Sequence, residues 1–130
     1  MTRSEARVVF AGELARFAAK YPRAEGCRLI IRAKHFLPHP EPRDLAWYDP
    51  DGHAITLIVA ALDRSIGSIL GIIRHELGHA ADRRVDVDRG CEARADRIAL
   101  AVTGSPIRYT ADGVQHATAG TIGRPKWLPQ

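Results

Sequence analysis

Two histidines four residues apart, with a glutamate directly after the first, form the run His75-Glu76-Leu77-Gly78-His79. In a helix, four residues turn through about 400° and rise about 6 Å, so both imidazoles leave the same face one turn apart. Two imidazole nitrogens at this spacing can bind one zinc ion. Glu76 lies at the edge of that face, where its carboxylate can take a proton from water without binding the metal. The run therefore predicts a hydrolytic metal site on a helix.

A catalytic zinc ion needs a third protein ligand and a position left open for water. Glu92 is the candidate, because it starts a new predicted helix 13 residues after His79, and the chain between them is long enough to reverse direction. A carboxylate in the first turn of a helix also has a simpler explanation, its favourable interaction with the helix dipole. Asp82, Asp86 and Asp88 are the alternative ligands.

Asp96 follows Glu92 by four residues and therefore lies on the same face of the predicted helix. From this position its carboxylate can accept a hydrogen bond from the outer nitrogen of a ligand histidine. It can equally form an exposed ion pair, which would contribute little to stability. Its possible arginine partners are Arg83, Arg84, Arg94 and Arg97.

Metal-assisted hydrolysis of a carbonyl compound also requires a group that stabilises the oxyanion of the tetrahedral intermediate. Three residues of the C-terminal segment, Arg108, Tyr109 and His116, have side chains of a suitable type. Their spacing does not determine which of them reaches the site, and His116 can equally be an ordinary loop residue. We therefore take Tyr109 and His116 as candidate catalytic residues beside Glu76.

The helices that must position these groups follow from the apolar pattern. Apolar residues recur at helical spacing over 4–20, over 65–83, which holds the histidine pair, and over 91–102, which holds Glu92. Gly78 weakens the second of these helices by about 1 kcal/mol relative to alanine. A glycine there suggests close approach of another backbone, although a merely tolerated glycine is the simpler explanation.

The strands are predicted between the first and second helices. Residues 27–36 are partly β-branched and bounded by Gly26 and Pro38, which indicates a strand. Residues 45–48 and 53–61 indicate a hairpin around Asp49-Pro50-Asp51-Gly52. The resulting order of helix, three strands, helix and helix predicts an α+β domain over residues 1–106, followed by an irregular tail over 107–130 that packs on or near the site.

Composition narrows the class of protein further. The chain has 130 residues, two cysteines and a net charge of +4, which fits one soluble domain with a mildly basic surface. The cysteines, Cys27 and Cys91, form no C-x-x-C pair, so neither a zinc ribbon nor a thioredoxin-like motif is available. No apolar run is long enough for a membrane span or a signal peptide. We therefore expect a cytoplasmic protein without a membrane anchor.

The chain resembles the gluzincin branch of the zincin metallopeptidases, whose pattern is H-E-x-x-H followed by E-x-x-x-D on the next helix. The corresponding residues are His75, Glu76, His79, Glu92 and Asp96. The resemblance implies a minimal zincin-like fold in which His75, His79 and Glu92 hold zinc. It also implies that Glu76 is the general base and that Asp96 is the hydrogen-bond partner of a zinc-ligating histidine. It covers residues 65–104.

Residues 92–99 are also similar to the second helix of compact cytoplasmic zincins, including the ImmA/IrrE-like peptidases and the minigluzincins. The Leu-Leu-Met-Pro ending common in the ImmA/IrrE-like group is absent, and Ala101-Val102-Thr103-Gly104-Ser105-Pro106 stands in its place. The metzincin extension is absent too, because Asp82 and Val85 occupy the positions of its glycine and third histidine. The resemblance is therefore to the compact gluzincin group as a whole.

These observations predict a zinc metallopeptidase in which zinc activates a water molecule and Glu76 is the general base. A peptide or protein substrate would lie along a free sheet edge beside residues 53–60, held by main-chain pairing. The alternative is a binding module that keeps its zinc for stability or for recognising a partner, with the tail crossing or blocking the site. A nucleic-acid-associated protein is less favoured, and its phosphate-binding arginines would be Arg83, Arg84, Arg89, Arg94 and Arg97.

Overall fold

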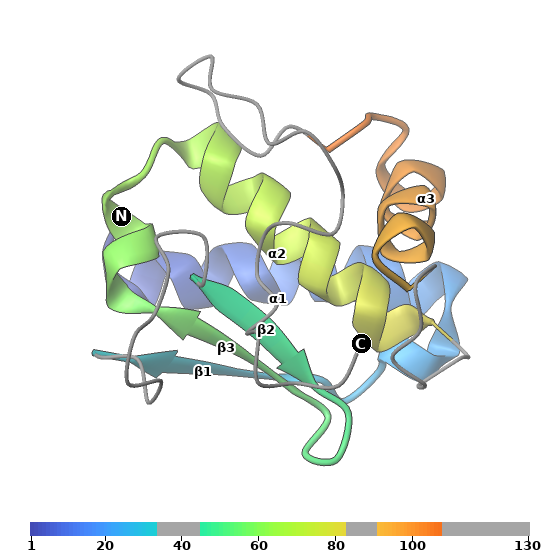
Figure 1. The fold of residues 1–130 in the computed structure, drawn as a ribbon, viewed down its shortest axis with the longest axis horizontal. Helices are drawn as coiled ribbons and strands as arrows, with labels where there is room; N and C mark the ends of the chain where they lie inside the picture. Colours follow the sequence, from blue (N-terminus) through green and yellow to red (C-terminus); the bar gives the residue numbers. More distant parts are fainter. Residues whose placement is uncertain (34–44, 83–90, 108–130) are drawn as a thin grey trace.

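Three α-helices and a small sheet make up the part of the chain that the computed structural model describes, residues 1–33, 45–82 and 91–107. The elements are α1 (Arg3–Lys20), η1 (Pro22–Ala24), β1 (Arg28–Arg32), β2 (Ala46–Asp49), β3 (Ala54–Ile58), η2 (Val59–Asp63), α2 (Ile66–Ala81) and α3 (Cys91–Thr103) (Figure 1). The predicted α+β class and the order of its helices and strands are confirmed. Of the predicted strand over 27–36, β1 spans 28–32, where its pairing with β3 ends, and residues 34–36 lie outside the described residues. No helix in the described ranges is long and apolar enough to cross a membrane.

The sheet is mixed, with β3 in its centre. β1 pairs with β3 in parallel and β2 pairs with β3 antiparallel, which gives the order β1-β3-β2. The expectation that residues 53–60 line a free edge is therefore wrong, because the backbone groups of β3 are already shared with a strand on each side. Within the described ranges, the outer strands of the sheet are β1 and β2.

The β2–β3 turn is held by local hydrogen bonds. The Asp49 carboxylate accepts a bond of 3.0 Å from the backbone N–H of Asp51, as is typical of an aspartate at the start of a turn. His53 has a φ of 47°, which is uncommon for a residue with a side chain. Its ring is held at both nitrogens, with the Tyr48 hydroxyl 2.6 Å from Nδ1 and the Glu25 carbonyl 3.0 Å from Nε2. These contacts stabilise the tight connection that aligns the two strands.

The core lies between the sheet and the helices. Tyr48 of β2 and Ile55 of β3 are opposite each other in the sheet, and they belong to the same buried cluster as Phe10 and Phe17 of α1. α2 crosses the molecule among the other elements (Figure 1), and it is buried nearly all round, as expected of a helix with neighbours on several sides. Full burial of a residue such as Ile73, which is 0% exposed, contributes about 1.5–3 kcal/mol. The helix with the predicted metal ligands is thus held by core packing along most of its length.

The start of α2 is set by Ser65, the first residue of the predicted helical range 65–83. The Ser65 hydroxyl accepts a hydrogen bond of 3.3 Å from the backbone N–H of Ser68, which satisfies one of the free donors of the first turn. The helix ends at Ala81, and the N–H of Asp82 donates to the carbonyl of His79 at 3.1 Å. Both ends of the helix that carries the histidine pair are therefore defined by hydrogen bonds.

α3 packs directly against α2 at Gly78. A Cβ atom on this glycine would lie 2.8 Å from the Cα of Ala95 and closer still to its carbonyl oxygen, nearer than real Cβ atoms approach. The close approach of another backbone, suggested by a glycine inside this helix, is therefore confirmed, and that backbone belongs to α3. Gly12 of α1 offers a contrast, because a Cβ there would meet nothing within 4 Å.

Replacing the two glycines by alanine should have opposite effects on stability. Gly78→Ala must push α3 away from α2, and overpacking of this kind destabilises by about 1–3 kcal/mol. Gly12→Ala adds a methyl group in open space and should be neutral or stabilising by up to about 1 kcal/mol. Urea unfolding of both variants measures the difference. Equal effects of the two substitutions would contradict the close contact at Gly78.

Candidate metal centre

Three side chains from α2 and α3 converge on one point. His75 and His79 project from α2 and Glu92 from the first turn of α3, with one ligand atom of each within 4.8 Å of the others. The Nε2 atoms of the two histidines are 3.2 Å apart. The Glu92 carboxylate lies 3.1 Å from His75 Nε2 and 2.8 Å from His79 Nε2. All three residues are buried, so their polar atoms face one another away from bulk water.

Asp96 determines how His75 presents its ring. Asp96 Oδ1 lies 2.7 Å from His75 Nδ1, and a carboxylate at that distance accepts the Nδ1–H. The lone pair of a neutral His75 is then on Nε2, which is the atom directed at Glu92 and His79. The contact between Asp96 and His75 thus orients the ring so that its free nitrogen points at the meeting point of the three residues.

This arrangement brings acceptors together and requires a positive charge between them. Burial lowers the pKa of His75, but hydrogen bonds to Asp96 and Glu92 raise it more strongly, to about 10. For Glu92, burial raises the pKa, whereas hydrogen bonds from His75 and His79 lower it further, below its usual value. In the metal-free protein the positive charge is therefore a proton on imidazole, held by the carboxylates.

The donor set also fits a zinc ion. Two imidazole nitrogens and one carboxylate oxygen form one of the three-ligand sets of catalytic zinc sites, in which a fourth position remains for water or substrate. The hydrogen bond from the outer nitrogen of a ligand histidine to a carboxylate, provided here by Asp96, is typical of such sites. His75, His79 and Glu92 are therefore the residues that would hold the metal.

Glu76 is next to this group in sequence and is 1% exposed. Its charge is close enough to contribute to the raised pKa of His75. The pKa of the Cys27 thiol rises to about 12, chiefly because the thiol is buried, and the charge of Glu76 adds to this rise. The carboxylate of Glu76 is thus held at low solvent access beside the metal ligands, and it is not among the three converging residues.

The other ligand candidates are placed differently. Asp82 Oδ2 lies 2.9 Å from Nε of Arg94 on α3, and Asp82 is not part of the converging group. Asp86 and Asp88 lie outside the described residues. Of the five arginines of the predicted phosphate-binding surface, Arg94 is mostly buried in this ion pair and Arg97 is exposed. The other three, Arg83, Arg84 and Arg89, lie outside the described residues.

The candidate oxyanion groups also lie outside the described residues. This applies to Arg108, Tyr109 and His116, and to the tail from residue 108 onwards. The roles of Tyr109 and His116 therefore stay predictions.

A second charged cluster lies beside the site and was not predicted from the sequence. Glu13 of α1 is buried and forms ion pairs with Arg74, the residue before His75, and with Arg16 at 2.9 Å. The sequence does contain a signal that Glu13 is buried, because it lies on the same helical stripe as the apolar Phe10 and Phe17. A carboxylate on a core-facing stripe requires a cationic partner.

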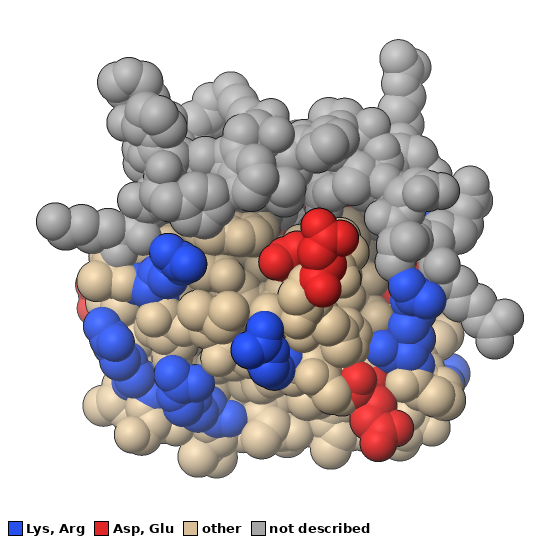
Figure 2. Space-filling model, turned by 90° about the horizontal axis from the view of Figure 1, so that it is seen from below, with Lys and Arg blue, Asp and Glu red and all other residues tan. Residues whose placement is uncertain are grey.

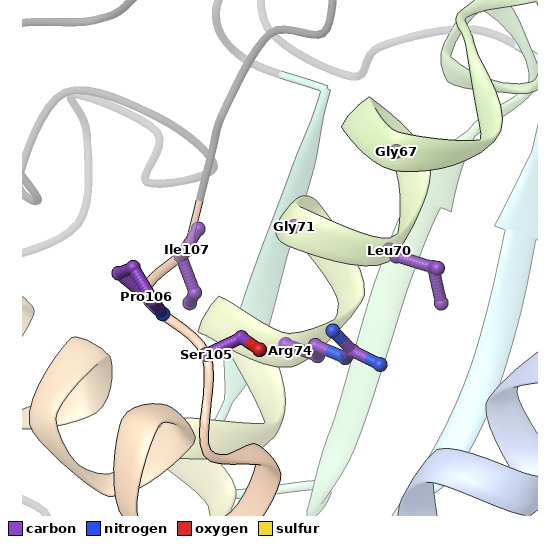
Figure 3. Close-up of a pocket in the computed structure, with 7 residues that line it drawn as sticks. All are labelled: Gly67, Leu70, Gly71, Arg74, Ser105, Pro106 and Ile107. Carbon is purple, nitrogen blue, oxygen red and sulfur yellow. The ribbon is translucent and has the colours of Figure 1, made fainter.

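Arg74 also lines a cavity of about 250 Å³ on another side of α2. Gly67 and Gly71 of α2 lie along it, and the segment Ser105–Ile107 that follows α3 passes opposite them (Figure 3). The segment after α3 thus returns to α2, so both ends of α3 are placed relative to the helix that carries the histidines.

Comparison with models of protein families, with curated proteins and with solved structures found no match to this chain. The case for a function therefore rests on the geometry and chemistry of the site itself.

Zinc binding should release a proton at neutral pH. Because the pKa of His75 is raised to about 10, the metal-free site is protonated at pH 7, and zinc must displace that proton. The affinity for zinc should therefore rise with pH until the pKa is reached. Titration calorimetry at pH 7 in buffers of different ionisation enthalpy should show about one proton released per zinc ion. Release should be smaller in Asp96→Asn, and equal release in both proteins would contradict the geometry of His75.

Metal content tests Glu92 as a ligand. After dialysis against a weak chelator, the wild-type protein should retain about one zinc ion per chain and Glu92→Ala clearly less. Asp51→Ala, which removes an exposed carboxylate in the β2–β3 turn, is the matched control and should retain the wild-type amount. Equal zinc in Glu92→Ala and Asp51→Ala would exclude Glu92 from the site.

Proposed function

We propose that this protein is a zinc-dependent metallopeptidase that hydrolyses peptide bonds. The observation that carries the proposal is the convergence of His75, His79 and Glu92, with Asp96 on the outer nitrogen of His75. Structural zinc sites usually provide four protein ligands, most of them cysteine, whereas catalytic sites provide three and leave one position open. Two histidines and one glutamate, without cysteine among the converging residues, support the catalytic alternative.

The chain's own residues have separable roles in this reaction. A zinc ion bound there would supply Lewis acidity, polarising the peptide carbonyl and lowering the pKa of water towards 7. Asp96 keeps the proton of His75 on Nδ1, so that Nε2 is available as a ligand. Glu76 takes the proton of the attacking water on its carboxylate and passes it to the nitrogen of the leaving amine. Low solvent access around Glu76 strengthens its interaction with the reacting groups.

A peptide substrate would pair with an outer strand of the sheet. Main-chain pairing suits a peptidase because it holds an extended chain irrespective of its side chains. β3 is engaged on both sides, which leaves β1 and β2 among the described strands. Of these two, β2 packs against α2, the helix that carries the histidines. We therefore propose that the substrate lies near β2, residues 46–49, the described outer strand that packs against the histidine helix of a zincin-like fold.

The test of catalysis is Glu76→Gln. The substitution preserves size but removes the base, so zinc binding should be retained while peptide cleavage falls by about 10²–10⁴-fold. Zinc content and mass-spectrometric detection of cleavage in a mixed peptide library measure the two properties on the same preparations. Glu25→Gln, which changes an exposed glutamate, should cleave like the wild-type protein.

Two results would count against the proposal. Unchanged cleavage by zinc-loaded Glu76→Gln would remove Glu76 from the reaction. A wild-type protein that binds zinc and cleaves none of the library would favour the alternative of a binding module that uses zinc for stability or recognition.

A further inference from the structure

An ion pair joins α2 and α3 directly beside the metal centre. Nε of Arg94 lies 2.9 Å from Oδ2 of Asp82, and the two side chains are 15% and 7% exposed. We infer that Arg94 is a positioning residue for the metal site, because its pair with Asp82 holds Glu92 against the two histidines. The inference rests on the proposed function, and it concerns how the third ligand is kept in place.

The position of the pair in the two helices supports this role. Asp82 comes three residues after His79 and is tied to it, since the Asp82 N–H donates to the His79 carbonyl at 3.1 Å. On α3, Arg94 comes two residues after Glu92 and directly precedes Ala95. The ion pair therefore connects the end of α2 to α3 within a few residues of a ligand on each side.

The ion pair adds a constraint that the backbone contact does not provide. The contact of Gly78 with Ala95 sets how closely the two helices approach, but α3 can still rotate about its own axis. A second tie through the Arg94 side chain opposes this rotation, which would swing Glu92 away from His75 and His79. Zinc sites tolerate only about 0.2 Å in their ligand distances, so a small rotation would weaken binding.

The chemistry of the pair suits positioning. A guanidinium group presents its donors in a rigid planar fork, so its partner is held in a defined direction, unlike the partner of a lysine ammonium. Both side chains lie largely out of water, so breaking their contact costs more than breaking an exposed ion pair would. The same contact directs the Asp82 carboxylate towards Arg94 on α3. Asp82 is therefore not part of the converging group, although its position in the sequence made it an alternative ligand.

The experiment compares Asp82→Asn, Arg94→Gln and the double variant. The dissociation constant for zinc alone is measured by competition with a chromophoric chelator. Each single substitution should weaken zinc binding about 10-fold, the lower end of the effect seen for groups that support metal ligands. The double variant should be no weaker than the weaker single variant, because the same interaction is removed only once. Arg97→Gln, an exposed arginine on the same helix, should bind zinc like the wild-type protein.

Two further readouts separate positioning from general stabilisation. Urea unfolding of the metal-free proteins reports stability, whereas zinc affinity and the visible spectrum of the cobalt-substituted proteins report ligand geometry in folded protein. Arg94→Lys, which keeps the charge without the planar fork and is the milder change should Arg94→Gln fail to fold, should recover part of the zinc affinity.

The outcomes distinguish this inference from the proposed function. A wild-type protein that binds no zinc overturns both. Wild-type zinc affinity and an unchanged cobalt spectrum in Asp82→Asn and Arg94→Lys, in a wild-type protein that binds zinc, overturn only the positioning role. Equal weakening by Arg97→Gln would also overturn it, because the effect would then come from surface charge in general.

Discussion

The close contact between Gly78 and Ala95 is the constraint on which the rest of the site depends. Histidine and glutamate side chains have a fixed reach, so groups on two helices can meet only if the helices approach closely. A side chain at position 78 would fill the space that the α3 backbone occupies. The interior glycine therefore weakens α2 as an isolated helix but permits the crossing that brings Glu92 to His75 and His79. Local helix propensity is subordinate here to the tertiary contact.

The second consequence of this crossing is electrostatic. Glu92 and Asp96 reach His75 from α3, and Glu76 lies beside it on α2. The buried group thus has more carboxylates than neutral imidazoles can satisfy, and it favours a cation, either protons or a metal ion. Elsewhere the fold compensates its buried charges with arginine, as Glu13 with Arg74 and Asp82 with Arg94 show. Around Glu92, two imidazoles take the position that arginine has in those ion pairs.

Much of the fold follows from local signals in the sequence, because helix periodicity, the Ser65 cap and the hairpin residues act over a few positions. The order of the strands was not predictable in this way. A hairpin pattern identifies β2 and β3 as neighbours, but the parallel pairing of β1 on the other side of β3 depends on how the whole chain crosses the core. For the site, regular spacing indicates which residues share a face. It does not indicate that Asp82 turns to Arg94, since that choice depends on the distance between two helices.

The five residues of the candidate centre all lie between His75 and Asp96, on two consecutive helices, whereas the sheet is built from residues 28–58. The segment of sequence that would bind the ion is therefore encoded separately from the segment that would bind the substrate. On the proposed function, substitutions in the sheet can change how a bound chain is held while the metal chemistry is retained. Substitutions between 75 and 96 would instead affect every substrate alike. Such a division allows a small domain to diversify its targets without rebuilding its catalytic centre.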